Sequence, residues 1–522
     1  MTNPANNQDA RFDFLKGSVS KSILVVNIIL AFMYFTILTF FFEHGNIVLF
    51  VLLIAGEVFH LWQIIGYCYT VWSNKSDAVF KKDFAEGVDV FITVAGEPVE
   101  IVEETARAAM AMDYPNFKIH ILNDGYVAKR DNWKDVIVLA KELGINSITR
   151  RIPGGAKAGN INNALRRTKN PYFVVFDADH VPKPEFLKEV MGYFADRRMG
   201  FVQTPQFYQN QGMNTVTQTA WDQQSLFFGP IMSGKNRLGS VFMCGTNMAV
   251  RRSAIDQVGG MCEFNIAEDF LTSLFIHKKG WKSVYVPKVL AEGLAPEDFL
   301  SYYKQQYRWT RGSLEVIFKF NPLFSRGLTF AQRMQYLISS GYYMTGVVVL
   351  IDALLPLIFL YTGVAAVQTS SMLLAMIFIP YIFLNLAILQ MTSNYAYTFN
   401  AISYSISSFW LQLRAIVAVL LNQKTSFVVT SKTAIEGNFT KLVIPHLIFI
   451  AIGIGGMVVA LVREGVSPAF IANTSWVLVN MIAFMPFIIS ALPKGAWKTR
   501  LTKLFSFASA RPDQAQVNRG EA

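Results

Sequence analysis

Tyr172-Phe-Val-Val-Phe-Asp-Ala-Asp-His180 is a continuous apolar run that stops abruptly at two acids and an imidazole. Such a run is typical of a strand buried on both faces. Alternation along a strand would place Asp177 and Asp179 on the same side, at the carboxyl end where open α/β sheets bind ligands. Two oxygen donors beside His180 suit Mg²⁺ or Mn²⁺ carrying a substrate phosphate. The alternative is a strand end whose acids cap the following turn.

The composition indicates a membrane protein. Hydrophobic residues make up 52% of the 522-residue chain, and the mean hydropathy is +0.32, which is too apolar for a purely soluble enzyme. No zinc-finger spacing, arginine-rich tail or aromatic-basic repeat accompanies the formal charge of +11, so nucleic acid is not an expected partner. The positive excess suits the cytoplasmic membrane face and an anionic substrate. Cys68, Cys244 and Cys262 are too few for a disulfide framework or a zinc site.

Hydropathy divides the chain into four regions. Residues 1–73 hold a polar start and two apolar spans, each near the ~20 residues that a bilayer requires, without the small-residue cleavage site of a signal peptide. Residues 74–322 have the charged, alternating character of a soluble α/β domain. Residues 323–493 return to membrane-length spans, and residues 494–522 form a short polar tail. The expected spans are 22–42, 47–69, 334–362, 371–391, 442–462 and 472–492.

The segment 402–421 is long enough to cross a membrane but contains several serines, Trp410, Gln412 and Arg414. If it crossed, the basic tail after residue 493 would lie on the opposite side from the 74–322 domain, against the positive-inside rule. We therefore expect a helix that lies in the headgroup plane. Six crossings then place both termini and the soluble domain in the cytosol, beneath the inner (plasma) membrane.

Strand and helix patterns alternate within the soluble domain, and acids recur at strand ends, as in nucleotide-binding α/β folds. Predicted strands are Val88–Val94, Phe117–Leu122, a short one around Ile148, and the strand that contains Tyr172; predicted helices are Val99–Met112, Lys129–Leu143 and Lys157–Arg167.

Three charged residues in this domain are candidates for nucleotide binding. Asp124, in Asn-Asp-Gly, could hold a nucleobase or ribose, or could simply close an Asx-turn. Glu97 follows the first strand and could be no more than a helix-start acid. Lys157 sits in a glycine-bearing turn before a helix, where a cation could meet a diphosphate, although a solvated lysine fits equally well.

Two later segments carry candidates for the chemistry. Glu268 and Asp269 begin an apolar helix, so one of them can cap it while the other is a candidate general base. Residues 298–320 have the mixed aromatic and basic pattern of an amphipathic helix at the bilayer surface. Trp309 in that segment is either a sugar-stacking platform or part of an interfacial aromatic belt.

Taken in order, the motifs N-D-G, D-x-D, A-E-D and Gln305-Gln-Tyr-Arg-Trp309 between membrane spans resemble the processive family 2 glycosyltransferases. That group of cellulose, chitin, curdlan and hyaluronan synthases has the signature D, D-x-D, T/A-E-D and Q-x-x-R-W. Three further segments are similar to segments of cellulose synthases: Phe242-Met-Cys-Gly-Thr246, Val202-Gln-Thr-Pro205 and Phe427-Val-Val-Thr-Ser-Lys432. The last of these is similar to a gating loop, and we expect that loop to span residues 423–437. The resemblance implies a GT-A-like (Rossmann-like) cytosolic glycosyltransferase domain between transmembrane helices.

The resemblance also implies residue roles. It assigns Asp269 as the catalytic base and a divalent ion, Mg²⁺ or Mn²⁺, to the D-x-D segment. The implied sets are Glu97, Asp124, Lys157, Asp177 and Arg308 for UDP; Asp177, Asp179 and His180 for the metal; Cys244, Glu268, Gln305 and Trp309 for the acceptor sugar; and Phe427, Val429, Thr430 and Lys432 for the gating loop.

The implied function is processive, inverting polymerisation of a UDP-sugar, UDP-glucose first, into a β-glucan that crosses the bilayer, with a periplasmic accessory subunit as a further partner. Alternatives are a chitin- or hyaluronan-type synthase using UDP-N-acetylglucosamine, a non-processive lipid-carrier glycosyltransferase, and a transporter with an inactive domain. The sequence departs from the family at Val94-Ala-Gly-Glu97 and Gly155-Ala-Lys157, where T-Y-N-E and H-A-K are usual. The tail is too short for a cyclic di-GMP-binding PilZ domain, so we expect no control by that nucleotide.

Overall fold

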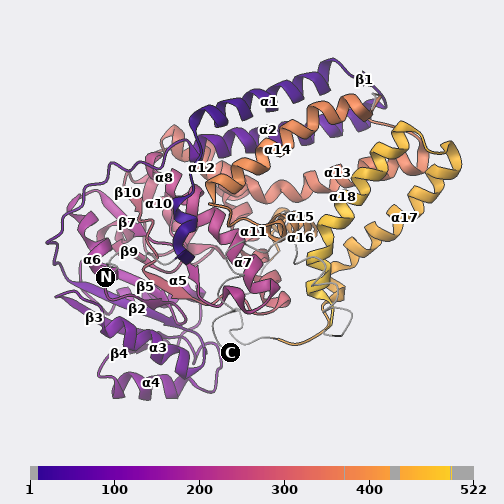
Figure 1. The fold of residues 1–522 in the computed structure, drawn as a ribbon. Coiled ribbons are helices and arrows are strands. Elements are labelled where there is room, and N and C mark those ends of the chain that lie inside the picture. The colour runs from indigo at the N-terminus through magenta and orange to yellow at the C-terminus, as the bar shows by residue number, and fades with distance from the viewer. Residues whose placement is uncertain (1–9, 369–370, 424–434, 494, 496–522) are drawn as a thin grey trace, which may run out of the picture.

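The computed structural model describes residues 10–368, 371–423, 435–493 and 495. It places an α/β domain beside a group of long helices (Figure 1). The predicted tail 494–522 and the predicted gating-loop residues Phe427, Val429, Thr430 and Lys432 lie outside the described residues, apart from the single position 495.

The α/β domain is built on a seven-stranded sheet with the strand order β10-β7-β9-β5-β2-β3-β4. Strands β5, β2, β3 and β4 are parallel, whereas β9 runs antiparallel between β5 and β7. The sequence patterns predicted the parallel strands but not β7, β9 and β10. The bounds are β2 (Val88–Val94), β3 (Phe117–Asn123), β4 (Asn146–Thr149), β5 (Tyr172–Asp177), β7 (Met199–Gln203), β9 (Met248–Arg251) and β10 (Lys282–Tyr285).

The central strands end together, and this positions the site. In the register of the sheet, Thr93 of β2 lies opposite Asp177 of β5, and Val94 lies opposite Asn123 of β3. All seven residues of β2 are buried, as expected for a strand covered on both faces. Polar residues that follow Val94, Asn123 and Phe176 therefore emerge at one edge of the sheet.

Helices cover the sheet at bounds close to those predicted. The expected helix at residues 129–143 begins only at Trp133, because residues 126–132 form turns and Lys129 has a positive φ of 54°. The helices of the domain are α3 (Val99–Met110), α4 (Trp133–Glu142), α5 (Ala156–Leu165), α6 (Phe186–Met191), α7 (Thr215–Leu226), α8 (Met232–Arg237), α9 (Arg252–Asp256), α10 (Glu268–Lys278) and α11 (Phe299–Glu315).

A three-stranded sheet joins segments that are far apart in the sequence. It has the order β6-β11-β8, formed by Val181–Pro182, Ala291–Gly293 and Phe207–Tyr208. Its pairing brings Tyr208 beside Gly293. A Cβ added to Gly293 would lie 2.5 Å from Nε2 of His180, so this small sheet forms the wall behind that imidazole.

Seven helical segments of the described residues are long and apolar enough to cross a membrane. The Phe399–Leu420 segment has the lowest hydropathy of the seven, 1.2, and the largest buried share, 56%. It consists of two helices that meet at Ser408. The helices in this group are α1 (Lys21–Phe40), α2 (Ile47–Val71), α12 (Phe330–Gly341), α13 (Thr345–Thr362), α14 (Ser371–Thr392), α15 (Phe399–Ser407), α16 (Phe409–Leu420), α17 (Ile444–Glu464) and α18 (Pro468–Ala491).

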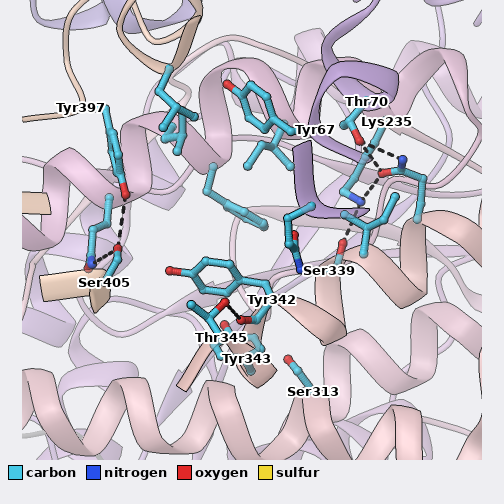
Figure 2. Close-up of a pocket in the computed structure, with 18 of the residues that line it drawn as sticks. Tyr67, Thr70, Lys235, Ser313, Ser339, Tyr342, Tyr343, Thr345, Tyr397 and Ser405 are labelled. Atoms are coloured by element: carbon cyan, nitrogen blue, oxygen red, sulfur yellow. Dashed lines mark hydrogen bonds between the residues drawn. The ribbon is translucent and has the colours of Figure 1, made fainter. Parts of the chain in front are cut away.

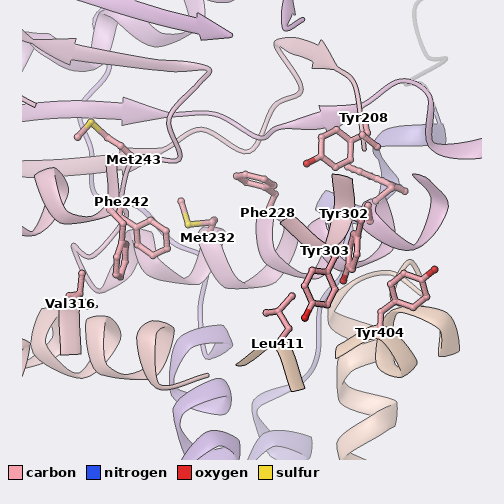
Figure 3. Close-up of a cluster of buried hydrophobic side chains, with 14 of the residues drawn as sticks. Tyr208, Phe228, Met232, Phe242, Met243, Tyr302, Tyr303, Val316, Tyr404 and Leu411 are labelled. Carbon is pink, nitrogen blue, oxygen red and sulfur yellow. The ribbon is translucent and has the colours of Figure 1, made fainter. Parts of the chain in front are cut away.

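One continuous hydrophobic cluster joins the domain to the long helices. Phe242 and Met243 from the domain, Tyr302 from α11, and Tyr404 and Leu411 from α15 and α16 are all buried in it (Figure 3). Burial of aromatic side chains of this size contributes roughly 1.5–3 kcal/mol each. The shared cluster fixes the domain against the helices, and α11 lies at their junction.

Candidate active site

Asp177, Asp179 and His180 converge at the carboxyl end of β5. Their potential ligand atoms all lie within 4.8 Å of one another. The predicted reason for this convergence was wrong: β5 ends at Asp177, and Asp179 lies in the turn that follows, not on the same face of a strand. The backbone N–H of Leu294 donates to Oδ2 of Asp179 at 3.2 Å, which holds the turned carboxylate in place.

The residues at this edge fit a divalent metal ion. Asp179 and His180 are 2% and 4% exposed. Neither ring nitrogen of His180 has a hydrogen-bond partner among the described residues, although Nδ1 lies 3.5 Å from Oδ1 of Asp179. A buried imidazole without a hydrogen bond is costly unless a ligand completes it. Two carboxylates and one imidazole form a donor set that Mg²⁺ and Mn²⁺ accept.

Lys157 is a partly buried ion-pair partner of Asp177, not a solvated lysine. It lies in the first turn of α5, after Gly154 and Gly155, whose φ values of 138° and 63° few other residues adopt. Its ammonium group pairs with Oδ1 of Asp177. Burial alone would lower the pKa of Lys157, but the charges of Asp177, Glu268 and Asp269 raise it above its usual value. Lys157 therefore carries a positive charge between the D-x-D edge and the acids of α10.

Asp124 is held by Arg150, a residue that the sequence reasoning missed. Arg150 donates from Nε to Oδ1 of Asp124 at 2.8 Å and from Nη2 to Oδ2 at 2.6 Å. The Asx-turn at this position is closed by Asn123, whose Oδ1 accepts from the backbone N–H of Gly125. Burial raises the pKa of Asp124 above its usual value, and Arg150 opposes that rise. The Asp124 side chain is thus oriented by an ion pair and does not form the turn.

Glu97 lies at the neighbouring strand end. Its Oε2 accepts from the backbone N–H of Ala95 at 2.6 Å, so it stabilises the turn after β2. Pro98 is the N-cap residue of α3, and Glu100 is the acid in the first turn of that helix. The alternative of a helix-start acid is therefore wrong for Glu97. The backbone N–H of Asp124 donates to the carbonyl of Val94, which places Glu97 and Asp124 at adjoining strand ends.

Glu268 and Asp269 begin α10, and both lie close enough to Lys157 for their charges to act on it. Burial raises the pKa of both carboxyl groups well above their usual values. Asp269 lies against Gly245, where an added Cβ would be 3.1 Å from Oδ2 of Asp269 and 3.6 Å from Nζ of Lys157. Gly245 has a φ of 84°. The close approach and the positive φ together explain a glycine at this position.

Hydrogen bonds from the Val202–Pro205 segment and from the next residue, Gln206, hold the Phe242–Thr246 segment in place. Gln203 accepts from the backbone N–H of Cys244 at 2.8 Å, and Gln206 donates to its carbonyl at 2.6 Å. Burial raises the pKa of the Cys244 thiol well above its usual value, so the thiol is neutral. Cys244 therefore has a fixed position and lines the cavity next to Asp269.

Helix α11 brings the Q-x-x-R-W residues to the acids. Burial lowers the pKa of Arg308, and the charges of Glu268, Asp177 and Asp269 oppose that effect, so the guanidinium group lies within electrostatic range of all three carboxylates. The Gln305 side chain lies beside the hydroxyl of Tyr208 and interacts with it. Tyr208 is a second residue that the sequence reasoning missed. It is 2% exposed and also interacts with Asp177 and Asp179.

A cavity of about 570 Å³ extends from this centre between the long helices. Cys244, Asp269 and Trp309 line its domain end, and Tyr67, Tyr342, Tyr343, Tyr397 and Ser405 line it farther along. Figure 2 shows these tyrosines from α2, the α12–α13 junction and the segment before α15 around one space. Lys235 forms part of the wall, where it donates to Gln335 and Ser339 at 2.8 and 2.9 Å.

The two described ends of the predicted gating segment are attached to α11. Arg311 donates to the backbone carbonyl of Gln423. The backbone N–H of Ile435 donates to Oδ2 of Asp298 at 3.1 Å, and Asp298 is also the N-cap residue of α11. Gln423 and Ile435 therefore both contact the helix that carries Arg308 and Trp309.

Two family models match the chain in overlapping regions. The "glycosyltransferase like family 2" model matches residues 85–312, and the "cellulose synthase" model matches residues 256–492. Together they cover the α/β domain, α11 and the later long helices, and their overlap contains Asp269, Arg308 and Trp309.

Curated relatives agree with these families. The chain is 30% identical over 452 residues to the UDP-forming cellulose synthase catalytic subunit of Pseudomonas fluorescens (strain SBW25), covering 82% of this chain and 60% of that protein. It is 30% identical over 454 residues to cellulose synthase 2 of Novacetimonas hansenii, covering 83% of this chain and 28% of that protein. The chain thus spans less than two thirds of the length of these relatives.

The fold is similar to that of the mannosyltransferase PcManGT from Pyrobaculum calidifontis, solved in complex with GDP-Man and Mn²⁺. The TM-score is 0.50 at 15% sequence identity, covering 72% of this chain and all of that one. This similarity confirms the predicted GT-A-like fold.

Proposed function

We propose that this chain, which belongs to the cellulose synthase-like family 2 glycosyltransferases, polymerises UDP-glucose into a β-glucan and conducts the product through the inner membrane. The observation that carries the proposal is the cavity that begins at Asp269 and Trp309 and continues between the long helices. A glycosyltransferase that releases a soluble product has no need for such a path. A transporter has no need for the surrounding charged centre.

The donor would bind across the strand ends. Asp124 and Glu97 lie where the uridine of a UDP-sugar would reach β2 and β3, and Lys157 and Arg308 bring positive charge to the diphosphate. When bound at Asp177, Asp179 and His180, Mg²⁺ or Mn²⁺ supplies Lewis-acid neutralisation of the leaving diphosphate. Tyr208 and Gln305 lie beside these groups.

The acceptor would be activated by Asp269. Its carboxylate faces the cavity in which Trp309 provides a flat surface for a sugar ring. The raised pKa makes Asp269 a stronger base than an ordinary aspartate. Removal of the hydroxyl proton as the oxygen attacks the anomeric carbon is a direct displacement, which converts an α-linked donor into a β-linked product. Cys244 and Glu268 border the same space.

The membrane arrangement follows from the helices and the tail. We assign six crossings and keep Phe399–Leu420 at the interface, because it is the least hydropathic and most buried of the seven candidates. The domain and both termini then lie in the cytosol, where UDP-sugars are made. A polysaccharide cannot cross hydrocarbon unaided, since each unpaired polar group costs several kcal/mol, and a periplasmic accessory subunit would receive it.

The donor and the linkage are tested with the purified full-length chain. Labelled UDP-glucose should give an insoluble polymer that a β-1,4-glucanase degrades, while UDP-N-acetylglucosamine should give none. A product that resists that enzyme but is degraded by a β-1,3-glucanase would show a β-1,3 linkage in place of the expected β-1,4 linkage. Incorporation from UDP-N-acetylglucosamine would favour a chitin- or hyaluronan-type synthase instead.

Ser313→Trp should shorten the polymer. Ser313 lies one helical turn after Trp309 on α11 and lines the cavity, so an indole there narrows the space that a growing chain enters. The first transfers, read as an initial burst of UDP, should persist while long products disappear from a sizing gel. Ser313→Ala is the matched control, because it removes the hydroxyl without filling the cavity. Full-length polymer from Ser313→Trp would exclude the cavity as the product path.

A further inference from the structure

A second cavity lies beside the site described above. It has a volume of about 540 Å³ and lies between α4, α5 and the loop after β4. It shares no lining residue with the 570 Å³ cavity. Elements α4 and β4 lie at the end of the domain opposite the long helices (Figure 1).

The lining of this cavity is strongly basic. Arg150, Arg151, Arg166 and Arg167 contribute four guanidinium groups, and Glu263 contributes the one carboxylate. Glu263 accepts a hydrogen bond from Nδ2 of Asn162 at 2.7 Å. Among the described residues, the side chains of Arg151, Arg166 and Arg167 have no hydrogen-bond or ion-pair partner. Neighbouring cations repel one another, so such a group is favourable where an anion can bind between them.

A buried polar group provides independent support. Asn163 lines the same cavity and is only 9% exposed, yet its Nδ2 has no hydrogen-bond partner within the described part of the chain. Buried amide donors are nearly always paired, because an unpaired one loses its hydration without compensation. A ligand oxygen would satisfy this donor. Trp133 adds an aromatic side chain to the cavity wall.

We propose that this cavity is a second binding site, specific for a phosphate-bearing anion. The guanidinium group is the side chain best suited to phosphate oxygens, which it binds through two parallel hydrogen bonds. Arg150 lies in both sites, because it lines the cavity and also holds the Asp124 carboxylate. The site is therefore next to the proposed donor site without overlapping the D-x-D edge. The proposal does not rest on the glycosyltransferase activity.

The test uses inorganic pyrophosphate as the probe and the full-length protein in metal-free buffer, where pyrophosphate cannot chelate a cation. We expect saturable binding by calorimetry that excess UDP does not displace. The double variant R166Q/R167Q should bind pyrophosphate at least tenfold more weakly, because each charge-assisted hydrogen bond is worth more than the free energy of a tenfold change. Arg151→Gln, at an exposed position, should weaken binding as well and serves as a second variant if the double variant does not fold.

The matched control is R197Q/R198Q, which removes another adjacent pair of exposed arginines from a different part of the domain. This control should bind pyrophosphate as the wild type does. Equal affinity in the wild type and in both the R166Q/R167Q and Arg151→Gln variants would overturn the proposal. Equal loss in R197Q/R198Q, or displacement by UDP, would also overturn it, since these results indicate non-specific attraction or the donor site. Sugar transfer is measured separately, so failure of the proposed function is distinguishable.

Discussion

Asp269→Asn should reduce sugar transfer by about 10²–10⁴-fold while UDP affinity stays close to that of the wild type. Asparagine has nearly the same shape but cannot take a proton. The acceptor oxygen would then attack without losing its proton in the transition state. UDP release from UDP-glucose measures the transfer rate, and calorimetry with UDP measures binding. The effect should appear in kcat, because the contacts that we propose between the donor and Lys157 and Arg308 remain.

The control is Asp256→Asn, at an exposed position in α9, which should leave both quantities unchanged. The pH dependence provides a second check. The base must be deprotonated, and burial raises the pKa of Asp269, so the wild-type rate should fall with decreasing pH at a higher pH than for an ordinary aspartate. Near-normal polymer synthesis by the Asp269→Asn variant would remove this residue from the role of base.

Asp179→Asn should abolish activation by divalent ions and lower turnover at least ~10³-fold, because metal stabilisation of a leaving phosphate is worth several kcal/mol. An asparagine oxygen can still accept the hydrogen bond from the backbone of Leu294, so the turn should keep its shape. Direct Mn²⁺ binding, followed by electron paramagnetic resonance with UDP present, should weaken in parallel.

Asp135→Asn is the matched control for the metal prediction, because Asp135 is an exposed acid in the first turn of α4. It should bind Mn²⁺ and release UDP at wild-type levels. If Asp179→Asn retains both the Mn²⁺ affinity and the turnover of the wild type, the metal site is not at the D-x-D edge.

Local patterns in the sequence predicted the parallel strands and the helices that follow them. The apolar run before Asp177 and the glycines before Lys157 have effects that extend over only a few residues, so they can be interpreted without long-range information. The turn after Asp177 shows where this reasoning fails. Both a longer strand and a tight turn would bring two acids close together, and only the pairing of β6 with β11 selects the turn.

The missed residues depend on contacts between distant segments. Arg150 lies 26 positions from Asp124, and basic residues at strand ends are too common to identify a partner by type alone. Tyr208 reaches the site because β8 pairs with β11, a segment more than 80 positions later in the chain. Strand β9 was missed for a similar reason, since its four residues are too few to show a clear period. Such pairings depend on the assembled sheet.

Helix α11 carries Arg308 and Trp309, and the residues that bind Gln423 and Ile435, Arg311 and the N-cap residue Asp298, belong to the same continuous stretch of backbone. A helix of this kind moves nearly as a rigid rod. Under the proposed function, a small tilt or roll of α11, caused by a glucan chain that advances past Trp309, would therefore move Arg308 relative to the bound nucleotide at the same time. Elongation and donor exchange would then be coupled through the backbone of one helix.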